Sequence, residues 1–334
     1  MVTESTEPAG HSEIPDIPPA IIEAASAGRL VLFVGAGVSR LAGGPSWSRS
    51  AENALEEIVE KRLIPFAEAE QLRKEHPKKK LSIAMDISQN AGSVLDFDRI
   101  FSPPENQLDA QIYRDLYSIG VPIVTTNYDK GLDYQALREA PVAGSVQALS
   151  GAGPQNVAIP PKQKGVVYIE KKDLTIEKLQ QPGLVIHLHG SIHDHKTMVV
   201  STRQYITHYR DDLVQVFLGK LFEGDYTVLF VGYGLEEEEI LEYVTQKSQT
   251  SLKLDAQEIK HFWLYPHLGF QEARFRHLSN YYRNHCNVRL EKFSIDRAGY
   301  IQLADVIAEW TEVLRRKVRA PEFLDKVRLI DKVT

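Results

Sequence analysis

Six short apolar runs constrain the fold of this 334-residue chain more than any other feature of its sequence. Several are apolar throughout rather than alternating, which is typical of strands buried on both faces of a parallel sheet. Helical patterns separate them, so the sequence predicts an α/β fold: a Rossmann-like, doubly wound, parallel six-stranded sheet. The runs are 29–34, 121–126, 184–188, 226–231, 261–265 and 288–293, and a weaker run at 166–169 is a candidate edge strand.

The segments between these runs differ widely in length. About 85 residues separate the first two runs, far more than one crossover helix needs. Helical spacing of apolar residues inside this segment predicts the first crossover helix and a helical insertion, about 48–118, that covers the sheet. After the last run, amphipathic spacing predicts helices at 301–316 and 321–330.

These patterns predict that the chain is divided into three parts. Residues 1–18 are polar and proline-rich and are expected to form a flexible tail. Residues 19–300 are expected to form one nucleotide-binding domain that includes the insertion, and residues 301–334 a C-terminal helical appendage. An acidic run at 236–239 is expected to open a further helix, where it favours the positive end of the helix dipole.

Composition excludes several classes of protein. The single cysteine, Cys286, rules out an intrachain disulfide and any zinc site that needs two cysteines. The net charge of −6 gives no overall electrostatic reason to bind nucleic acid or an anionic membrane. Apolar stretches such as 226–234 are under half of the ~20 residues that span a bilayer. The first residues lack the pattern of a signal peptide. We therefore expect a cytoplasmic protein with no membrane segment.

Small and polar residues follow four of the predicted strands. Because the carboxyl ends of parallel strands meet at one edge of a sheet, where ligands bind, these clusters are expected to lie together. Gly35, Ala36 and Gly37 would let the backbone approach a phosphate, although Arg40 stands where a dehydrogenase fingerprint has its third glycine. A tight turn alone would also explain these glycines. The clusters read GAGVS at 35–39, TTNYD at 125–129, HLHGS at 187–191 and VGYG at 231–234.

These four motifs, in this order and spacing, resemble the Sir2 (sirtuin-like) superfamily. The likeness is greatest to its bacterial branch that cleaves NAD in anti-phage defence, and within it to the Sir2 protein paired with a HerA-like ATPase. The resemblance implies NAD+ as the substrate, assembly into a large homo-oligomeric ring, and activation by assembly or by a partner. A HerA-like ATPase is the first partner expected and an Argonaute the second. Whether the assembled complex binds nucleic acid stays open.

The resemblance also implies which residues are catalytic, namely Asn127 and His189. An asparagine side chain both donates and accepts, so Asn127 can hold the attacking water or the ribose hydroxyls. A histidine titrates near neutrality, so His189 can act as a general base. Purely structural roles are the alternatives: Asn127 would form an Asx turn, and His189 would be a hydrogen-bonded histidine at the end of a strand.

Further residues are expected to bind NAD. Asp129 would orient His189 or bind ribose, or instead cap a helix that begins at Lys130. Ser39 would cap its helix or contact a phosphate. Tyr233 would stack on the adenine or approach its ribose. The complete expected binding set is Gly35, Ala36, Gly37, Ser39, Thr126, Asp129, Gly190, Gly232 and Tyr233.

A metal site is the competing interpretation of the histidines. His187 and His189 would share one face of a strand, and paired histidines do bind zinc or iron. However, His193 and His195 fall in a turn and no carboxylate cluster accompanies them, so no metal is expected.

Three functions remain open at this stage. The leading one is an NAD+ glycohydrolase that yields nicotinamide and ADP-ribose or a cyclic form, as an NAD-depleting effector. The others are a non-catalytic module that binds NAD or ADP-ribose, and an NAD-dependent protein deacylase, which the missing zinc-binding cysteines disfavour. The helix at 301–316 and the insertion are candidate assembly surfaces, unless both only cover the sheet.

Overall fold

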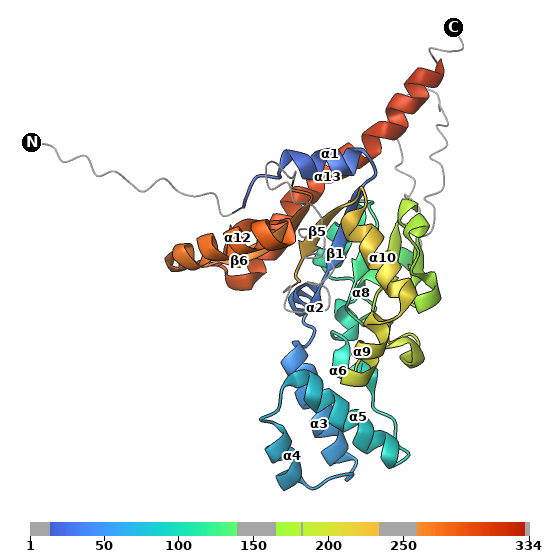
Figure 1. The fold of residues 1–334 in the computed structure, drawn as a ribbon, viewed down its shortest axis with the longest axis vertical. Helices are drawn as coiled ribbons and strands as arrows, with labels where there is room; N and C mark the ends of the chain where they lie inside the picture. Colours follow the sequence, from blue (N-terminus) through green and yellow to red (C-terminus); the bar gives the residue numbers. More distant parts are fainter. Residues whose placement is uncertain (1–13, 139–164, 182, 234–258, 331–334) are drawn as a thin grey trace, which may run out of the picture.

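One parallel sheet organises the molecule (Figure 1). The computed structural model describes residues 14–138, 165–181, 183–233 and 259–330, with side chains up to residue 318. Its strand order is β3-β4-β2-β1-β5-β6-β7, and every pair is parallel. The strands are β1 Leu30–Val34, β2 Ile123–Thr125, β3 Val166–Tyr168, β4 Leu184–His187, β5 Thr227–Val231, β6 His261–His267 and β7 Val288–Ser294.

This order confirms the predicted Rossmann-like fold. Without the edge strand β3, the remaining six strands have the 3-2-1-4-5-6 order of dinucleotide-binding domains. The sheet has seven strands rather than six because the weak run at 166–169 pairs with β4. The direction of winding reverses between β1 and β5, which places the ligand-binding crevice of such folds at their carboxyl ends.

Burial on both faces explains why the strands are apolar throughout. All five residues of β1 are buried. Leu30, Leu32 and Val34 belong to one hydrophobic cluster, and Val31 and Phe33 belong to another on the opposite face. Each side chain along β1 therefore needs to be apolar, whichever face it points to.

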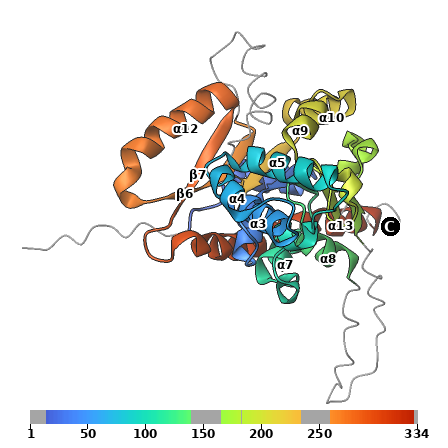
Figure 2. The same ribbon diagram turned by 90° about the horizontal axis from the view of Figure 1, so that it is seen from below.

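Helices cover the two faces separately (Figure 2). The face with Leu32 is covered by α1 Pro19–Ser26, α7 Gln111–Ser118, α8 Gly131–Leu137 and α13 Gln302–Ile330. The face with Phe33 is covered by α9 Thr202–Tyr209, α10 Asp212–Glu223 and α12 Glu272–Cys286. Both layers have their own buried cluster, as expected of a doubly wound fold.

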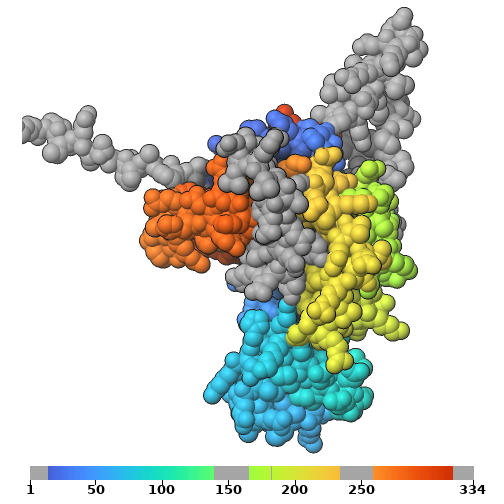
Figure 3. All heavy atoms as spheres, viewed as in Figure 1, coloured from blue at the N-terminus to red at the C-terminus, as the bar shows by residue number. Residues whose placement is uncertain are grey.

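The helical insertion does not cover a face of the sheet as predicted. Its helices form a lobe beyond the carboxyl ends of the strands, seen at the bottom of Figure 1 and Figure 3. This lobe has a separate core, which also takes in Tyr128, Ile192 and Met198 from the segments that follow β2 and β4. The crossover helix on the sheet is α7, at the end of the predicted insertion. The lobe contains α3 Trp47–Glu60, α4 Phe66–Leu72, α5 Pro77–Asn90 and α6 Phe97–Phe101.

The C-terminal segment is part of the core rather than an appendage. A single helix, α13, replaces the two predicted helices and continues through Pro321, which the sequence had suggested as a boundary. Trp310 and Leu314 are buried in the cluster beside α1 and α7. Within residues 302–318, the face of α13 that carries Trp310 and Leu314 is therefore not free to serve as the assembly surface that the sequence suggested.

The described part of the predicted N-terminal tail is also packed. Ile14 and Ile17 contact the core cluster, and the indole Nε1 of Trp310 donates a hydrogen bond of 2.8 Å to the carbonyl of Pro15. Residues 1–13 and the expected helix at 236–239 lie outside the described residues. Within the described ranges, no helix combines the length and hydrophobicity that a membrane crossing requires.

Two neighbouring positions on α13 test its place in the core. Leu314 is fully buried, whereas Val313 is 38% exposed. We expect Leu314→Ala to lower the free energy of unfolding by about 2–5 kcal/mol, through lost burial and a cavity, and Val313→Ala to change it by less than about 1 kcal/mol. Denaturant unfolding measures both. Equal small effects would contradict the packing of α13 against the sheet.

Candidate functional site

The ends of β1 and β5 touch at the crevice, and glycine makes this possible. The amide of Gly35 donates to the carbonyl of Val231 at 3.0 Å, and that of Gly37 donates to Gly232 at 2.8 Å. A Cβ on Gly35 would lie 2.6 Å from Cα of Tyr233. Gly232 adopts φ +63° and has no room for a Cβ beside Val38. The glycines thus serve close packing, and the amides of Gly35 and Gly37 are already bonded.

A buried network joins the residues that follow β1 and β2. The amide nitrogen Nδ2 of Asn127 donates to the carbonyl of Gly35 at 3.0 Å and to Oγ of Ser39 at 2.9 Å. Ser39 in turn donates from Oγ to Oδ2 of Asp129 at 2.5 Å. Oδ1 of Asn127 accepts no hydrogen bond from any described residue. The side-chain oxygen of Asn127 is therefore the atom left to bind a ligand or water.

Asp129 completes this network and does not orient His189. Its Oδ1 accepts hydrogen bonds of 2.9 Å from the hydroxyl of Tyr113 and from the amide of Gly131 at the start of α8. The predicted role next to His189 is thus wrong, whereas the helix-capping alternative is close to what is found. Ser39 lies inside α2 Ala36–Leu41 instead of capping it. Both side chains hold the strand ends together.

His187 points away from His189 into a second polar cluster. Its Nδ1 donates to the carbonyl of Asn127 at 2.8 Å, and its Nε2 lies 2.6 Å from Oδ1 of Asp133. The other Asp133 oxygen faces Nε2 of His193 at 3.1 Å. Burial alone would raise the pKa of Asp133, but His187 and His193 lower it to about 2. Burial likewise disfavours the charged form of His187, but Asp133 raises its pKa. His187 is therefore a charged structural partner of Asp133.

His189 is buried among aromatic rings and is kept neutral. Its Nε2 lies 2.7 Å from the hydroxyl of Tyr209, and its ring contacts those of Tyr205 and His208. Burial lowers the pKa of His189 well below its usual range, and the nearby His208 and Lys78 lower it further. Nδ1 has no hydrogen-bond partner among the described residues. His189 is therefore neutral, and the lone pair or proton on its Nδ1 is not used by any described residue.

The remaining predicted site residues lie at the same edge. Thr126 is buried and donates its amide to the carbonyl of Val34 at 3.3 Å. Gly190 adopts φ +76°, and a Cβ there would lie 2.2 Å from the carbonyl of Thr197. Tyr233 was predicted to stack on adenine. Its ring instead packs edge-on against Phe33, with 5.2 Å between the ring centres, and so faces the core. No group of three or more potential metal ligands occurs within the described ranges.

Comparison with known proteins identifies the domain that carries these residues. The family model described as a SIR2-like domain matches residues 121–287, half of the chain. The chain belongs to the SIR2-like domain family. No curated protein matches it. The matched region contains Asn127 and His189, whereas the GAGVS segment lies before it. Membership gives this Sir2-like protein an NAD-linked function and, broadly, an NAD-dependent enzymatic activity.

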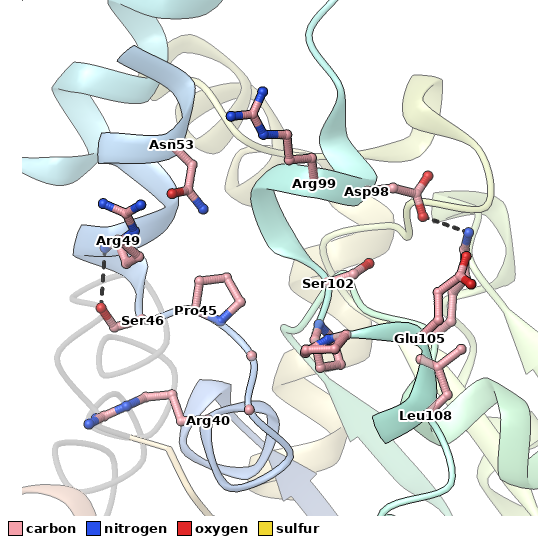
Figure 4. Close-up of a pocket in the computed structure, with 15 residues that line it drawn as sticks. Arg40, Pro45, Ser46, Arg49, Asn53, Asp98, Arg99, Ser102, Glu105 and Leu108 are labelled. Atoms are coloured by element: carbon pink, nitrogen blue, oxygen red, sulfur yellow. Dashed lines mark hydrogen bonds and ion pairs between the residues drawn. The ribbon is translucent and has the colours of Figure 1, made fainter. Parts of the chain in front are cut away.

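A pocket of about 850 Å³ lies between the Sir2-like sheet and the lobe (Figure 4). It includes Arg40 and Lys130, which directly follow Ser39 and Asp129, but neither Asn127 nor His189. The amide of Gly44, another lining residue, donates to the carbonyl of Ser39 at 2.7 Å. The pocket thus contacts the network from the side of the lobe.

Several residues of the Sir2-like site were not found from the sequence. Tyr113 and Asp133 lie on helices whose spacing indicates only apolar packing. Tyr209 and His208 lie on α9, some 20 residues after His189, and no motif links them to it. The sequence signal for these residues was a polar side chain on the apolar face of a predicted helix. A polar group that becomes buried there needs a hydrogen-bond partner.

The buried, neutral His208 is expected to make the stability of the protein depend on pH. It is 6% exposed, its Nε2 has no hydrogen-bond partner among the described residues, and burial followed by Lys171 lowers its pKa to about 4. Between pH 6.5 and 4 the unfolded chain binds a proton that the folded one excludes, so stability falls as the pH falls. The loss attributable to His208 is about 3 kcal/mol.

We expect His208→Phe to reduce this loss of stability in acid, as measured by denaturant unfolding at pH 7 and pH 4.5. His277, exposed on α12, supplies the control variant His277→Phe, which should keep the wild-type pH dependence. An unchanged pH dependence in His208→Phe would show that His208 titrates normally.

Proposed function

We propose that this protein is an NAD+ glycohydrolase that releases nicotinamide and forms ADP-ribose or a cyclic product. The observation that carries the proposal is the neutral, buried His189 at the same sheet edge as Asn127, with one imidazole nitrogen and one amide oxygen that bond to no described residue. An uncharged base and an uncharged polar group fit a substrate whose leaving group is itself cationic, since no acid is needed to protonate it.

The residues have separate tasks in this reaction. Asn127 holds the attacking water or a ribose hydroxyl through Oδ1, while its Nδ2 stays fixed to Gly35 and Ser39. As the bond from the ribose to nicotinamide breaks, nicotinamide leaves with the bonding electron pair. The water oxygen bonds to the anomeric carbon, and its proton passes to His189. Burial supports the step because it excludes competing solvent and strengthens the fixed dipoles.

Tyr209 keeps His189 in position for proton transfer. Nε2–H of His189 can donate to the Tyr209 oxygen, which leaves the lone pair on Nδ1. Tyr209 is therefore a positioning residue that acts through His189 and does not contact the substrate.

Two alternative functions are less well supported. A protein deacylase of this superfamily would have paired zinc-binding cysteines, and this sequence contains only Cys286. A non-catalytic NAD or ADP-ribose module is favoured by one observation, the low exposure of Asn127 and His189, 8% and 1%. The orientation of His189 by Tyr209 supports catalysis over simple binding, since a binding module needs no general base.

The biological role that we propose is NAD depletion in bacterial anti-phage defence, in the cytoplasm. The buried site fits a protein that is inactive until assembly into a homo-oligomeric ring, or a partner such as a HerA-like ATPase, opens it. The lobe is the proposed assembly surface, and Phe66 and Val94 are exposed on it at 63% and 71%. An Argonaute remains the second candidate partner.

Nicotinamide release from NAD+ tests the proposed activity. We expect Asn127→Ala and His189→Ala each to lower turnover by about 100-fold or more, because each removes a group that acts on the water. The assay should be run with and without a HerA-like ATPase. His277→Ala is the matched control and should retain wild-type turnover. No nicotinamide under any of these conditions, with NAD+ bound, would leave only the binding module.

The positioning role of Tyr209 has its own test. Tyr209→Phe keeps the ring and removes the hydroxyl, and we expect it to lower kcat roughly tenfold with little change in KM. We also expect the acid limb of the pH profile of kcat to shift, because His189 loses its fixed tautomer. Tyr281→Phe, at an exposed position on α12, is the control. A wild-type pH profile in Tyr209→Phe would contradict the role.

A further inference from the structure

Three backbone amides of the strand-end turn are already bonded within the protein. In the turn after β1, the amide of Gly35 donates to Val231, that of Gly37 to Gly232 at 2.8 Å, and that of Val38 to Gly35 at 3.1 Å. A nucleotide diphosphate that arrives at this edge therefore cannot use these three amides as hydrogen-bond donors. Its negative charge has to be balanced by a cationic side chain near the turn.

Arg40 is a cation next to this turn, and it has no carboxylate partner in the part of the chain that the structure describes. It is exposed, follows Ser39 directly, and forms no ion pair with any described residue. The other three cations around the pocket are paired. Arg49 contacts Glu56 at 3.1 Å, Arg99 contacts Glu60 at 2.5 Å, and Lys130 contacts Asp98 at 2.7 Å. Arg40 is thus the pocket cation whose charge is not offset within the described residues.

Tyr300 positions Arg40 beside the turn. The guanidinium carbon of Arg40 lies 5.6 Å from the centre of the Tyr300 ring. The Tyr300 hydroxyl lies against Gly37, since a Cβ on Gly37 would be 2.2 Å from it. Burial raises the pKa of Tyr300 to about 12, although Arg40 acts to lower it. This neutral hydroxyl adds a hydrogen-bonding group without repelling an anion.

The pocket beside Arg40 has the charge and size for a nucleotide. Its lining carries four cations, of which Arg49, Arg99 and Lys130 are paired with carboxylates, so Arg40 is the lining cation left for an anion. Its volume of about 850 Å³ lies within the range of nucleotide-sized ligand sites. In Figure 4, Arg40 lies on α2 at one side of this pocket, across from Ser102 and Leu108.

We propose that Arg40 binds the diphosphate of the substrate, the group shared by NAD+ and ADP-ribose, and so selects dinucleotides over shorter nicotinamide ribosides. This inference deepens the proposed function and rests on it for the identity of the substrate. Arg40 acts on binding and specificity, while Asn127 and His189 act on the bond that breaks.

ADP-ribose binding tests the proposal without any turnover, by titration calorimetry on the full chain. We expect Arg40→Gln to weaken binding roughly tenfold, and Arg40→Lys to restore most of it because the charge returns. Arg274→Gln, at an exposed arginine on α12, is the matched control and should bind as the wild type does. In the nicotinamide assay, we expect Arg40→Gln to lower the preference for NAD+ over nicotinamide riboside by a similar factor.

The outcomes separate this inference from the proposed function. Wild-type affinity for ADP-ribose in Arg40→Gln, or no ADP-ribose binding by the wild type, would overturn it. Binding that depends on Arg40 without any nicotinamide release would contradict the hydrolase and leave Arg40 as a diphosphate-binding residue.

Discussion

A buried set of hydrogen bonds ties the ends of β1 and β2 together, and the rest of the site depends on it. Asn127 donates to Gly35 and Ser39, and Ser39 donates to Asp129. These bonds fix the turn that follows β1, and this turn borders the switch point between β1 and β5, where a ligand would enter. Each buried polar atom in the tie needs its partner, because an unsatisfied one costs about 1–3 kcal/mol. The same bonds also orient Oδ1 of Asn127, so the structural and the proposed chemical role of this residue cannot be separated.

His187 and His189 lie two residues apart, but their surroundings favour different protonation states. His187 faces Asp133 and the carbonyl of Asn127, and this pair of acceptors favours the charged ring. His189 faces Tyr209 and aromatic rings, and burial favours the neutral ring. The surroundings of His187 therefore favour its charged form, and those of His189 keep its ring neutral. The lobe contributes to this difference, since Lys78 on α5 further lowers the pKa of His189.

The sequence predicted what depends on local pattern and missed what depends on packing. Continuous apolar runs identified the strands, and the order of these strands puts the motifs with Asn127 and His189 at one edge of the sheet. The place of the lobe did not follow, because its apolar helices pack equally well on a sheet or on each other. The continuity of α13 was hidden by Pro321. Tyr209 could not be found, because only the fold brings α9 to His189.

The closed site holds His189 in its neutral form, which is the form that the proposed reaction needs. Nuclear magnetic resonance of 15N-labelled histidine side chains, with His189→Gln to assign the signal, measures this directly across a pH titration. We expect the His189 imidazole to stay neutral well below pH 6.5, about the ordinary pKa of a histidine side chain. A midpoint at or above that value would contradict the buried, neutral base on which the proposed chemistry rests.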